Sequence, residues 1–207
     1  MPTENERKYV LDLKIVEDWD ELKKTLGDTL KSAKSIQQAY LYGDPHWTIR
    51  LRDATGAGNE THLIMCLKYD VGERVVEIEQ HIDERDFVDL WPHSVRQLHK
   101  YRYDLHPNEK DKWEIDFFLG RDGQPYFVMA EHEMPEGQAA PATVPFLIRK
   151  YLLYTVPQAE QFEFSSYNLA DPAIAREVYQ QALRAKSAVS GSQSPEPQLT
   201  EPPEDKE

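Results

Sequence analysis

The chain has 207 residues, of which 40% are hydrophobic and 29% charged, which suits one medium-sized domain with an ordinary core. No apolar run approaches the roughly 20 residues of a membrane span, and the first eight residues lack the apolar core of a signal peptide. We therefore expect neither a membrane protein nor a secreted precursor. The net charge of -13 is opposite to that of a surface for duplex nucleic acid. The single cysteine, Cys66, excludes an intramolecular disulfide and a thiolate zinc site, and indicates a reducing, cytoplasmic setting.

In the first half of the chain, strands with a two-residue period surround one predicted helix. The first strand covers residues 4–11. The segment Glu17–Ser32 then carries apolar residues at helical spacing, with acids early and lysines late, as the helix dipole favours. Three further strands are predicted at His46–Arg52, at residues 63–68 and at Arg74–Ile82. On each strand charged side chains alternate with apolar ones, so the two kinds lie on opposite faces.

The second half continues this alternation and adds three helices. A short helix is predicted at Asp83–Trp91, ended by Pro92, and strands follow at residues 100–103, 113–117 and 128–133. Helices are also predicted at Thr143–Tyr154 and at Asp171–Ser187, which begins with Asp-Pro. Residues 188–207 are rich in proline, serine and acids and contain no aromatic residue. We expect them to form a disordered acidic tail behind a domain of residues 1–187.

The charged positions of the strands fall in same-sign pairs two residues apart. A sheet with one solvated face explains any single alternation, but such faces tend to mix signs, whereas six pairs here each concentrate one sign. A closed barrel resolves this, because charged faces that point into one lumen bring acids and bases together, while helices cover the apolar outer faces. The predicted lumen holds eight acids and six bases: Glu4, Glu6, Glu77, Glu79, Glu114, Asp116, Glu131 and Glu133, with Lys8, Arg50, Arg52, Lys68, Lys100 and Arg102.

These two sets of side chains favour different ligands. Paired carboxylates offer the hard oxygen atoms that Mg²⁺ or Mn²⁺ prefers. A group of lysines and arginines suits a polyanion, and the guanidinium fork matches phosphate oxygens. Together they predict a phosphate chain that a divalent metal bridges to the protein.

The order and spacing of these residues resemble the CYTH, or triphosphate tunnel metalloenzyme, superfamily over roughly residues 3–134. Glu4-Asn-Glu6-Arg-Lys8 is similar to its N-terminal E-x-E-x-K signature, and the ordered charged pairs continue as far as Glu131-His-Glu133. The resemblance implies an α+β fold with a closed eight-stranded antiparallel tunnel. By position, Glu4, Glu6, Glu131 and Glu133 are implied to hold metal, and the six bases to bind the phosphates. Asp116 is implied to lie near that metal, and Glu77 and Glu79 to orient a water or hold a second metal. These three acids are our catalytic candidates.

The function implied is metal-dependent hydrolysis of inorganic triphosphate or a small organic triphosphate, by a monomer or homodimer. Two alternatives stay open. A class IV adenylate cyclase has nearly the same tunnel residues, and a non-catalytic polyphosphate- or nucleotide-binding module needs the bases but not all eight acids. One departure from the family concerns its closing C-terminal helix, which carries a basic residue. The sequence leaves open whether Arg149 or Lys150 reaches the lumen.

Overall fold

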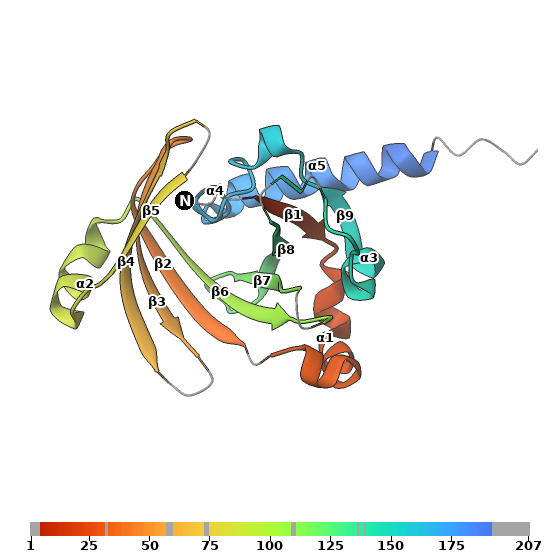
Figure 1. The fold of residues 1–207 in the computed structure, drawn as a ribbon, viewed down its shortest axis with the longest axis horizontal. Helices are drawn as coiled ribbons and strands as arrows, with labels where there is room; N and C mark the ends of the chain where they lie inside the picture. The colour runs from red at the N-terminus through yellow and green to blue at the C-terminus, as the bar shows by residue number, and fades with distance from the viewer. Residues whose placement is uncertain are drawn as a thin grey trace, which may run out of the picture.

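The computed structural model describes residues 5–31, 33–56, 60–72, 75–108, 111–135, 137–138 and 140–191, so Glu4 and residues 192–207 of the predicted tail lie outside it. The described chain forms nine strands flanked by helices (Figure 1). The strands are β1 Glu6–Leu11, β2 Lys34–Gly43, β3 Trp47–Thr55, β4 Thr61–Asp70, β5 Val75–His81, β6 Arg96–Leu105, β7 Trp113–Leu119, β8 Pro125–Glu133 and β9 Leu152–Thr155. The helices are α1 Lys14–Leu26, α2 Glu84–Leu90, α3 Phe146–Tyr151, α4 Ser166–Leu169 and α5 Pro172–Gly191.

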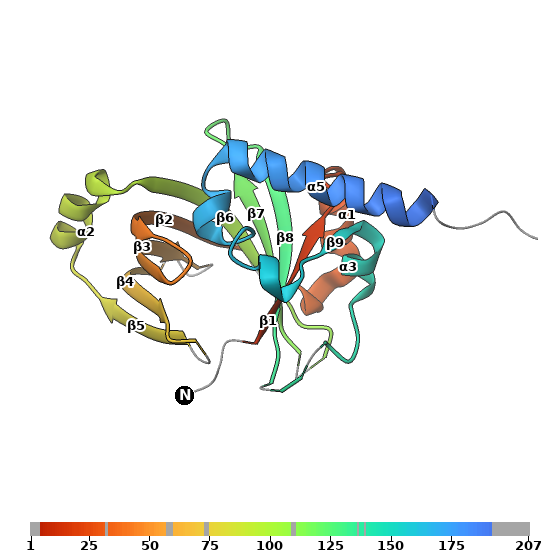
Figure 2. The same cartoon turned by 90° about the horizontal axis from the view of Figure 1, so that it is seen from above.

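The strands form one antiparallel sheet in the order β5-β4-β3-β2-β6-β7-β8-β1-β9. The predicted antiparallel α+β class is confirmed, but the sheet has nine strands rather than eight. Within the described ranges no strand pairing joins β5 to β1 or β9. The sheet is strongly curved, with β2–β5 forming one wall and β6–β8 with β1 the other (Figure 2).

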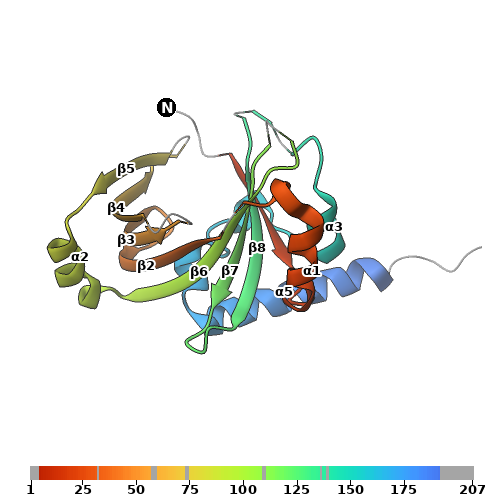
Figure 3. The same ribbon diagram turned by 90° about the horizontal axis from the view of Figure 1, so that it is seen from below.

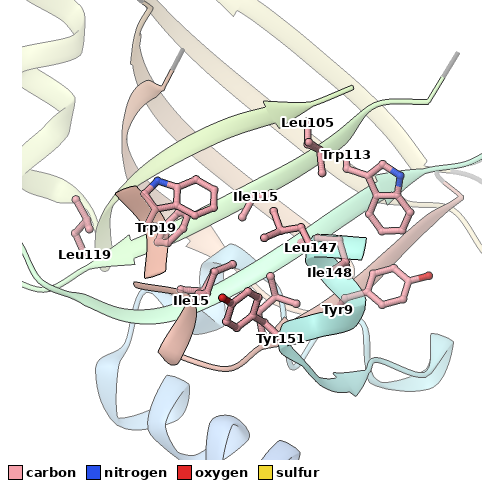
Figure 4. Packing of buried hydrophobic residues seen from close by; sticks show 14 residues of the cluster. Tyr9, Ile15, Trp19, Leu105, Trp113, Ile115, Leu119, Leu147, Ile148 and Tyr151 are labelled. Atoms are coloured by element: carbon pink, nitrogen blue, oxygen red, sulfur yellow. The ribbon is translucent and has the colours of Figure 1, made fainter. Parts of the chain in front are cut away.

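The outer face of β1, β7 and β8 carries the first hydrophobic core. Tyr9, Trp113 and Ile115 lie at alternate positions on these strands and pack against Trp19 of α1 and Ile148 of α3 (Figure 4). Seen from below, α1 and α3 lie together on one side of these strands (Figure 3). Residues of opposite parity carry the charges, as the two-residue period predicted. These helices thus cover the outside of the sheet, as expected.

Helices α4 and α5 lie on the other face, which the prediction had given to charged residues alone. Phe118, Phe127 and Met129 share the inner parity with Asp116 and Glu131, and they are buried in a second core with Leu169 of α4 and with α5. Burying each such apolar side chain contributes roughly 1.5–3 kcal/mol to folding. The inner face is therefore charged along one part of these strands and apolar along the rest.

Two helix boundaries differ from the prediction for local reasons. The helix predicted at Glu17–Ser32 spans Lys14–Leu26, because Gly27 (φ +49°) adopts a backbone conformation that disfavours other residues and ends α1. The predicted helix Thr143–Tyr154 is helical only over Phe146–Tyr151, because residues 152–155 form β9 on the free edge of β1.

The remaining two predicted helices agree more closely with the structure. Helix α2 begins after Asp83, whose carboxylate accepts a hydrogen bond from the backbone N–H of Asp86, as an N-cap does. Helix α5 extends to Gly191 and so includes the first residues of the predicted tail. No helix in the described ranges is long and apolar enough to cross a membrane.

Candidate functional site

A cavity of about 490 Å³ lies on the charged part of the inner face. The curved sheet forms one side. The other side is the segment between Gln158 and Tyr167, which leads into α4 and is called here the 158–167 wall. Three of the predicted acids line the cavity, namely Glu6, Glu114 and Glu131, and two further acids, Asp44 and Asp70, line it as well. It is also lined by all six predicted phosphate-binding bases: Lys8, Arg50, Arg52, Lys68, Lys100 and Arg102. The fold therefore brings these bases together from β1, β3, β4 and β6.

Five charged residues of β6, β7 and β8 form a compact set, called here the β6–β8 cluster: Lys100, Arg102, Glu114, Asp116 and Glu131. Asp116 is at its centre and is fully buried. Its carboxylate accepts from Lys100 Nζ at 2.5 Å and from Arg102 Nε and Nη2 at 2.6 Å each. Arg102 also donates to Glu131 at 2.8 Å and to Glu114.

These contacts determine the ionisation of Asp116. Burial by itself raises the pKa of Asp116, but Arg102 and Lys100 outweigh it and hold the pKa well below its usual range. Asp116 does not line the cavity. Its hydrogen bonds hold the side chains of Lys100 and Arg102, which do line the cavity.

A second set, called here the β3–β5 cluster, consists of Arg50, Arg52, Lys68, Glu77 and Glu79. Its N···O separations are longer, from 3.3 Å between Arg50 and Glu77 to 3.7 Å between Arg52 and Glu79. The Glu79 side chain is 42% exposed, and neither Glu77 nor Glu79 lines the cavity. The Nε atoms of Arg50 and Arg52 are buried and have no hydrogen-bond partner in the described chain. These N–H groups are free to donate to an anion in the cavity.

Glu6 and Glu131 form a carboxylate pair at the cavity wall. Burial and the charge of Glu131 raise the pKa of Glu6 to about 7, although Lys8, with Nζ 3.6 Å from Glu6 Oε1, acts in the opposite direction. Oε1 of Glu6 is buried without a hydrogen-bond partner in the described chain. Glu114 faces Glu131 across β7 and β8 and adds a third carboxylate. Repelling carboxylates with an unsatisfied oxygen fit a divalent cation that binds through oxygen.

Three other charged residues that the sequence singled out lie elsewhere, and a fourth is outside the described residues. Glu133 is opposite Glu6 in the pairing of β1 with β8, but it is exposed and does not line the cavity. Glu4 lies outside the described residues. Arg149 and Lys150 are exposed on α3, and Lys150 pairs with Asp18 at 3.6 Å. Neither Arg149 nor Lys150 lines the cavity, so neither takes the place of the basic residue that the family carries on its closing helix.

One group of possible metal donors lies beside the cavity, formed by Cys66, Glu77 and Glu79. Cys66 Sγ lies 3.1 Å from Glu77 Oε1. Burial, partly opposed by Arg50, raises the pKa of the Cys66 thiol to about 11, so it is neutral at ordinary pH. Arg50, Arg52 and Lys68 already neutralise the two carboxylates. In the described structure the oxygen atoms of this group are therefore already engaged by bases.

The sequence analysis assigned no site residue to three parts of the cavity lining: strand β2, the turn at residues 44–48 and the 158–167 wall. On β2, Gln38 and Tyr40 are buried at its surface, and Gln38 Nε2 donates to the Tyr40 hydroxyl at 3.1 Å. Their parity with Arg50 and Arg52 across the β2–β3 pairing was the available signal. The 158–167 wall carried no such signal, because its place depends on how α4 and α5 pack on the inner core.

Comparisons with known proteins find likeness in structure only. No family model matches the chain, and no curated protein matches its sequence. A crystal structure of NE1496, described as an inorganic triphosphatase, is 24% identical with a TM-score of 0.51, over 82% of this chain and 95% of that one. Another crystal structure of NE1496, described as a hypothetical protein, is also 24% identical, with a TM-score of 0.51, over 81% of this chain and 97% of that one. The PH1012 protein of Pyrococcus horikoshii is 13% identical, with a TM-score of 0.45, over 64% of this chain and 80% of that one. The chain thus shares the fold of NE1496, which confirms the fold relationship that the sequence resemblance implied.

Proposed function

We propose that the protein is a metal-dependent triphosphatase that hydrolyses inorganic triphosphate or a small organic triphosphate in this cavity. One observation carries the proposal: six bases from four strands converge on a cavity that also holds the Glu6–Glu131 carboxylate pair. A polyanion alone explains the bases, but it leaves the repelling carboxylates unexplained. The name given to NE1496, an inorganic triphosphatase of the same fold, supports the same substrate class.

In this proposal the bases bind and orient the phosphate chain. The free Nε–H groups of Arg50 and Arg52 donate to phosphate oxygens, and Lys100 and Arg102, held by Asp116, balance charge from the facing wall. The Tyr40 hydroxyl accepts from Gln38, so its own hydrogen is available to the substrate.

The metal site is proposed at Glu6 and Glu131, with Glu114 beside them and Glu4 and Glu133 as further candidates. When bound, Mg²⁺ or Mn²⁺ supplies positive charge that stabilises the charge developing on the phosphate oxygens. The protein's own residues fix the substrate and the water that attacks it. The closed eight-stranded tunnel is also part of the proposal: β1–β8 supply the strands, and β5 would have to approach β1 to close it.

Glu77 and Glu79 are proposed to orient the attacking water. In the described structure they pair with Arg50, Arg52 and Lys68. A triphosphate that binds these bases competes with the two carboxylates and leaves an oxygen free to accept the proton of a water molecule. Asp116, buried and saturated with hydrogen bonds, acts through Lys100 and Arg102 instead.

The test is phosphate release from a panel of inorganic, thiamine and nucleoside triphosphates, each with Mg²⁺, Mn²⁺ or excess chelator. We expect metal-dependent release by the natural protein and none by Glu131→Gln, with Arg149→Ala as a control that removes a charge outside the cavity. Equal release in chelator would refute the metal dependence. Formation of cyclic AMP from ATP faster than phosphate release would favour the cyclase alternative, and binding of triphosphate without any turnover would favour the binding module.

A further inference from the structure

Arg96, the first residue of β6, belongs to neither charged cluster. It shares the inner parity of β6 with Lys100 and Arg102, but it does not line the cavity and forms no ion pair with a carboxylate in the described chain. Its Nη1 donates to the backbone oxygen of Tyr167 and to Oδ1 of Asn168, both at 2.9 Å. Its guanidinium carbon lies 4.2 Å from the centroid of the Tyr167 ring. These contacts all lead to α4, at the end of the 158–167 wall.

The contact continues from α4 into the wall through Asn168. The Asn168 side chain accepts from Arg96 and donates through Nδ2 to the backbone oxygen of Phe162 at 2.9 Å. Its backbone N–H donates to Ser165 Oγ at 3.3 Å. Phe162, Ser165 and Tyr167 all line the cavity. One arginine thus holds several cavity residues through a single amide side chain.

The Tyr167 ring is confined from the other side by β2. A Cβ atom at Gly43 would lie 2.4 Å from the Tyr167 ring, so only glycine permits this approach. Tyr40, which lines the cavity, meets the same ring edge-on with centroids 5.3 Å apart. The ring therefore lies between β2 and Arg96, and its position depends on both.

The wall in turn touches two of the phosphate-binding bases. Ser166 Oγ lies 3.3 Å from Lys100 Nζ, and the backbone oxygen of Gln161 lies 3.5 Å from Lys8 Nζ. A displacement of the wall therefore changes both the width of the cavity and the surroundings of these lysines.

We propose that Arg96 is a positioning residue that, by holding Tyr167 and Asn168, fixes the 158–167 wall at the distance from the bases that the substrate requires. The expected effect on turnover rests on the proposed function. The fixing of the 158–167 wall by Arg96, called here the clamp, does not. Arg96 takes no part in bond breaking. Its loss should therefore weaken substrate binding more than it slows the chemical step.

The test compares Arg96→Met with Arg96→Lys by amide hydrogen exchange and by steady-state kinetics with inorganic triphosphate. In Arg96→Met we expect exchange in residues 158–169 to accelerate about tenfold, with β7 and β8 unchanged. We expect KM to rise about tenfold and kcat to change less than about threefold. Arg96→Lys keeps the positive charge and one donor nitrogen but loses the planar guanidinium fork, so it should be intermediate. Gln97→Ala, at the exposed next position of β6, is the matched control and should resemble the natural protein.

A second variant acts on the same ring from the opposite side. Gly43→Ala places a methyl group against Tyr167 and should also accelerate exchange in 158–169 and raise KM; if Arg96→Met does not fold, this variant and Arg96→Lys decide. Unchanged exchange in folded Arg96→Met, or a fall in kcat at constant KM, would overturn the clamp. If the natural protein hydrolyses no triphosphate, accelerated exchange still supports the clamp, and only the proposed function fails.

Discussion

The two charged clusters face the same cavity, but they are built differently. In the β6–β8 cluster Asp116 is fully buried, and its contacts with Lys100 and Arg102 measure 2.5–2.6 Å. In the β3–β5 cluster the separations are 3.3–3.7 Å, and Glu79 is 42% exposed. Charges that are desolvated and saturated with hydrogen bonds keep one geometry, whereas looser pairs exchange partners readily. The comparison indicates that the β6–β8 cluster forms a fixed side of the cavity, called here the fixed wall, and that the β3–β5 cluster forms an adaptable side, called here the adaptable wall.

The position of each cluster in the sheet explains this difference. Strand β7 lies between β6 and β8, with hydrophobic cores on both faces, so water is excluded around Asp116. Strand β5 is the edge of the sheet, and most of its residues are exposed. The same residue types in the same alternating pattern therefore form a rigid ion cluster in one place and a hydrated one in the other.

The largest expected effect is on stability, from Asp116→Asn. Without the carboxylate charge, Lys100 and Arg102 remain buried together with too little negative charge nearby, which should cost about 3–5 kcal/mol of unfolding free energy. Urea unfolding followed by circular dichroism measures this. A loss below about 1 kcal/mol would show that the β6–β8 cluster is no more rigid than its counterpart.

A smaller effect is expected on binding, from Arg52→Ala. Arg52 has a buried Nε without a partner in the described chain and only a 3.7 Å contact to Glu79, so its main role is proposed to be toward the substrate. Triphosphate binding should weaken by about 1.5–3 kcal/mol, while the unfolding free energy changes little. Calorimetric titration with triphosphate measures the loss, and Arg149→Ala on the outer helix α3 is the control. Unchanged affinity would remove Arg52 from the binding surface.

Sequence reasoning reached the residues of both clusters but not the difference between them. The two-residue period put Arg50, Arg52, Lys100 and Arg102 on the inner face, because strand geometry alone decides that face. Whether water is excluded from an ion pair such as Arg102–Asp116 depends on neighbouring strands and on helices that are distant in sequence. For the same reason the pattern could not reveal that Phe118 and Met129, at the same parity as Asp116, would be covered by α5.

The 158–167 wall and β9 illustrate a second limit of the sequence pattern. The apolar run at 152–155 suited a helix as well as a strand, and only the free edge of β1 decided between them. Gln158 and Ser166 have no periodic neighbours that mark them as cavity residues. Their role became visible only when Arg96 and Tyr167 were placed together in space.

A pH-dependent effect is expected for the metal-free protein, because the pKa of Glu6 is raised to about 7 from an ordinary value of 4.5. Between these values the folded state binds more protons than the unfolded state, so stability falls as pH rises from 4.5 to 7 and then levels off. Glu6→Gln should remove this loss and raise the unfolding free energy at pH 8 by about 1–2 kcal/mol, since 30% of the side chain is exposed and screened. At pH 4 the variant and the natural protein should agree. Thermal unfolding at both pH values, in chelator, measures this, and equal stabilisation at pH 4 and pH 8 would contradict it.

The smallest effect on stability is expected from Glu79→Gln, and it separates the two walls most clearly. The Glu79 side chain contacts Arg50 and Arg52 only at 3.6 and 3.7 Å and is largely hydrated, so its loss should change the unfolding free energy by less than about 1 kcal/mol. If Glu79 orients the attacking water, kcat should nevertheless fall about 100-fold. Phosphate release under saturating triphosphate and urea unfolding of the same preparation measure both quantities. Full turnover in Glu79→Gln would leave Glu77 as the only water-orienting candidate on β5. A large loss of stability would mean that the β3–β5 cluster holds the fold together, and that the adaptable wall does not exist.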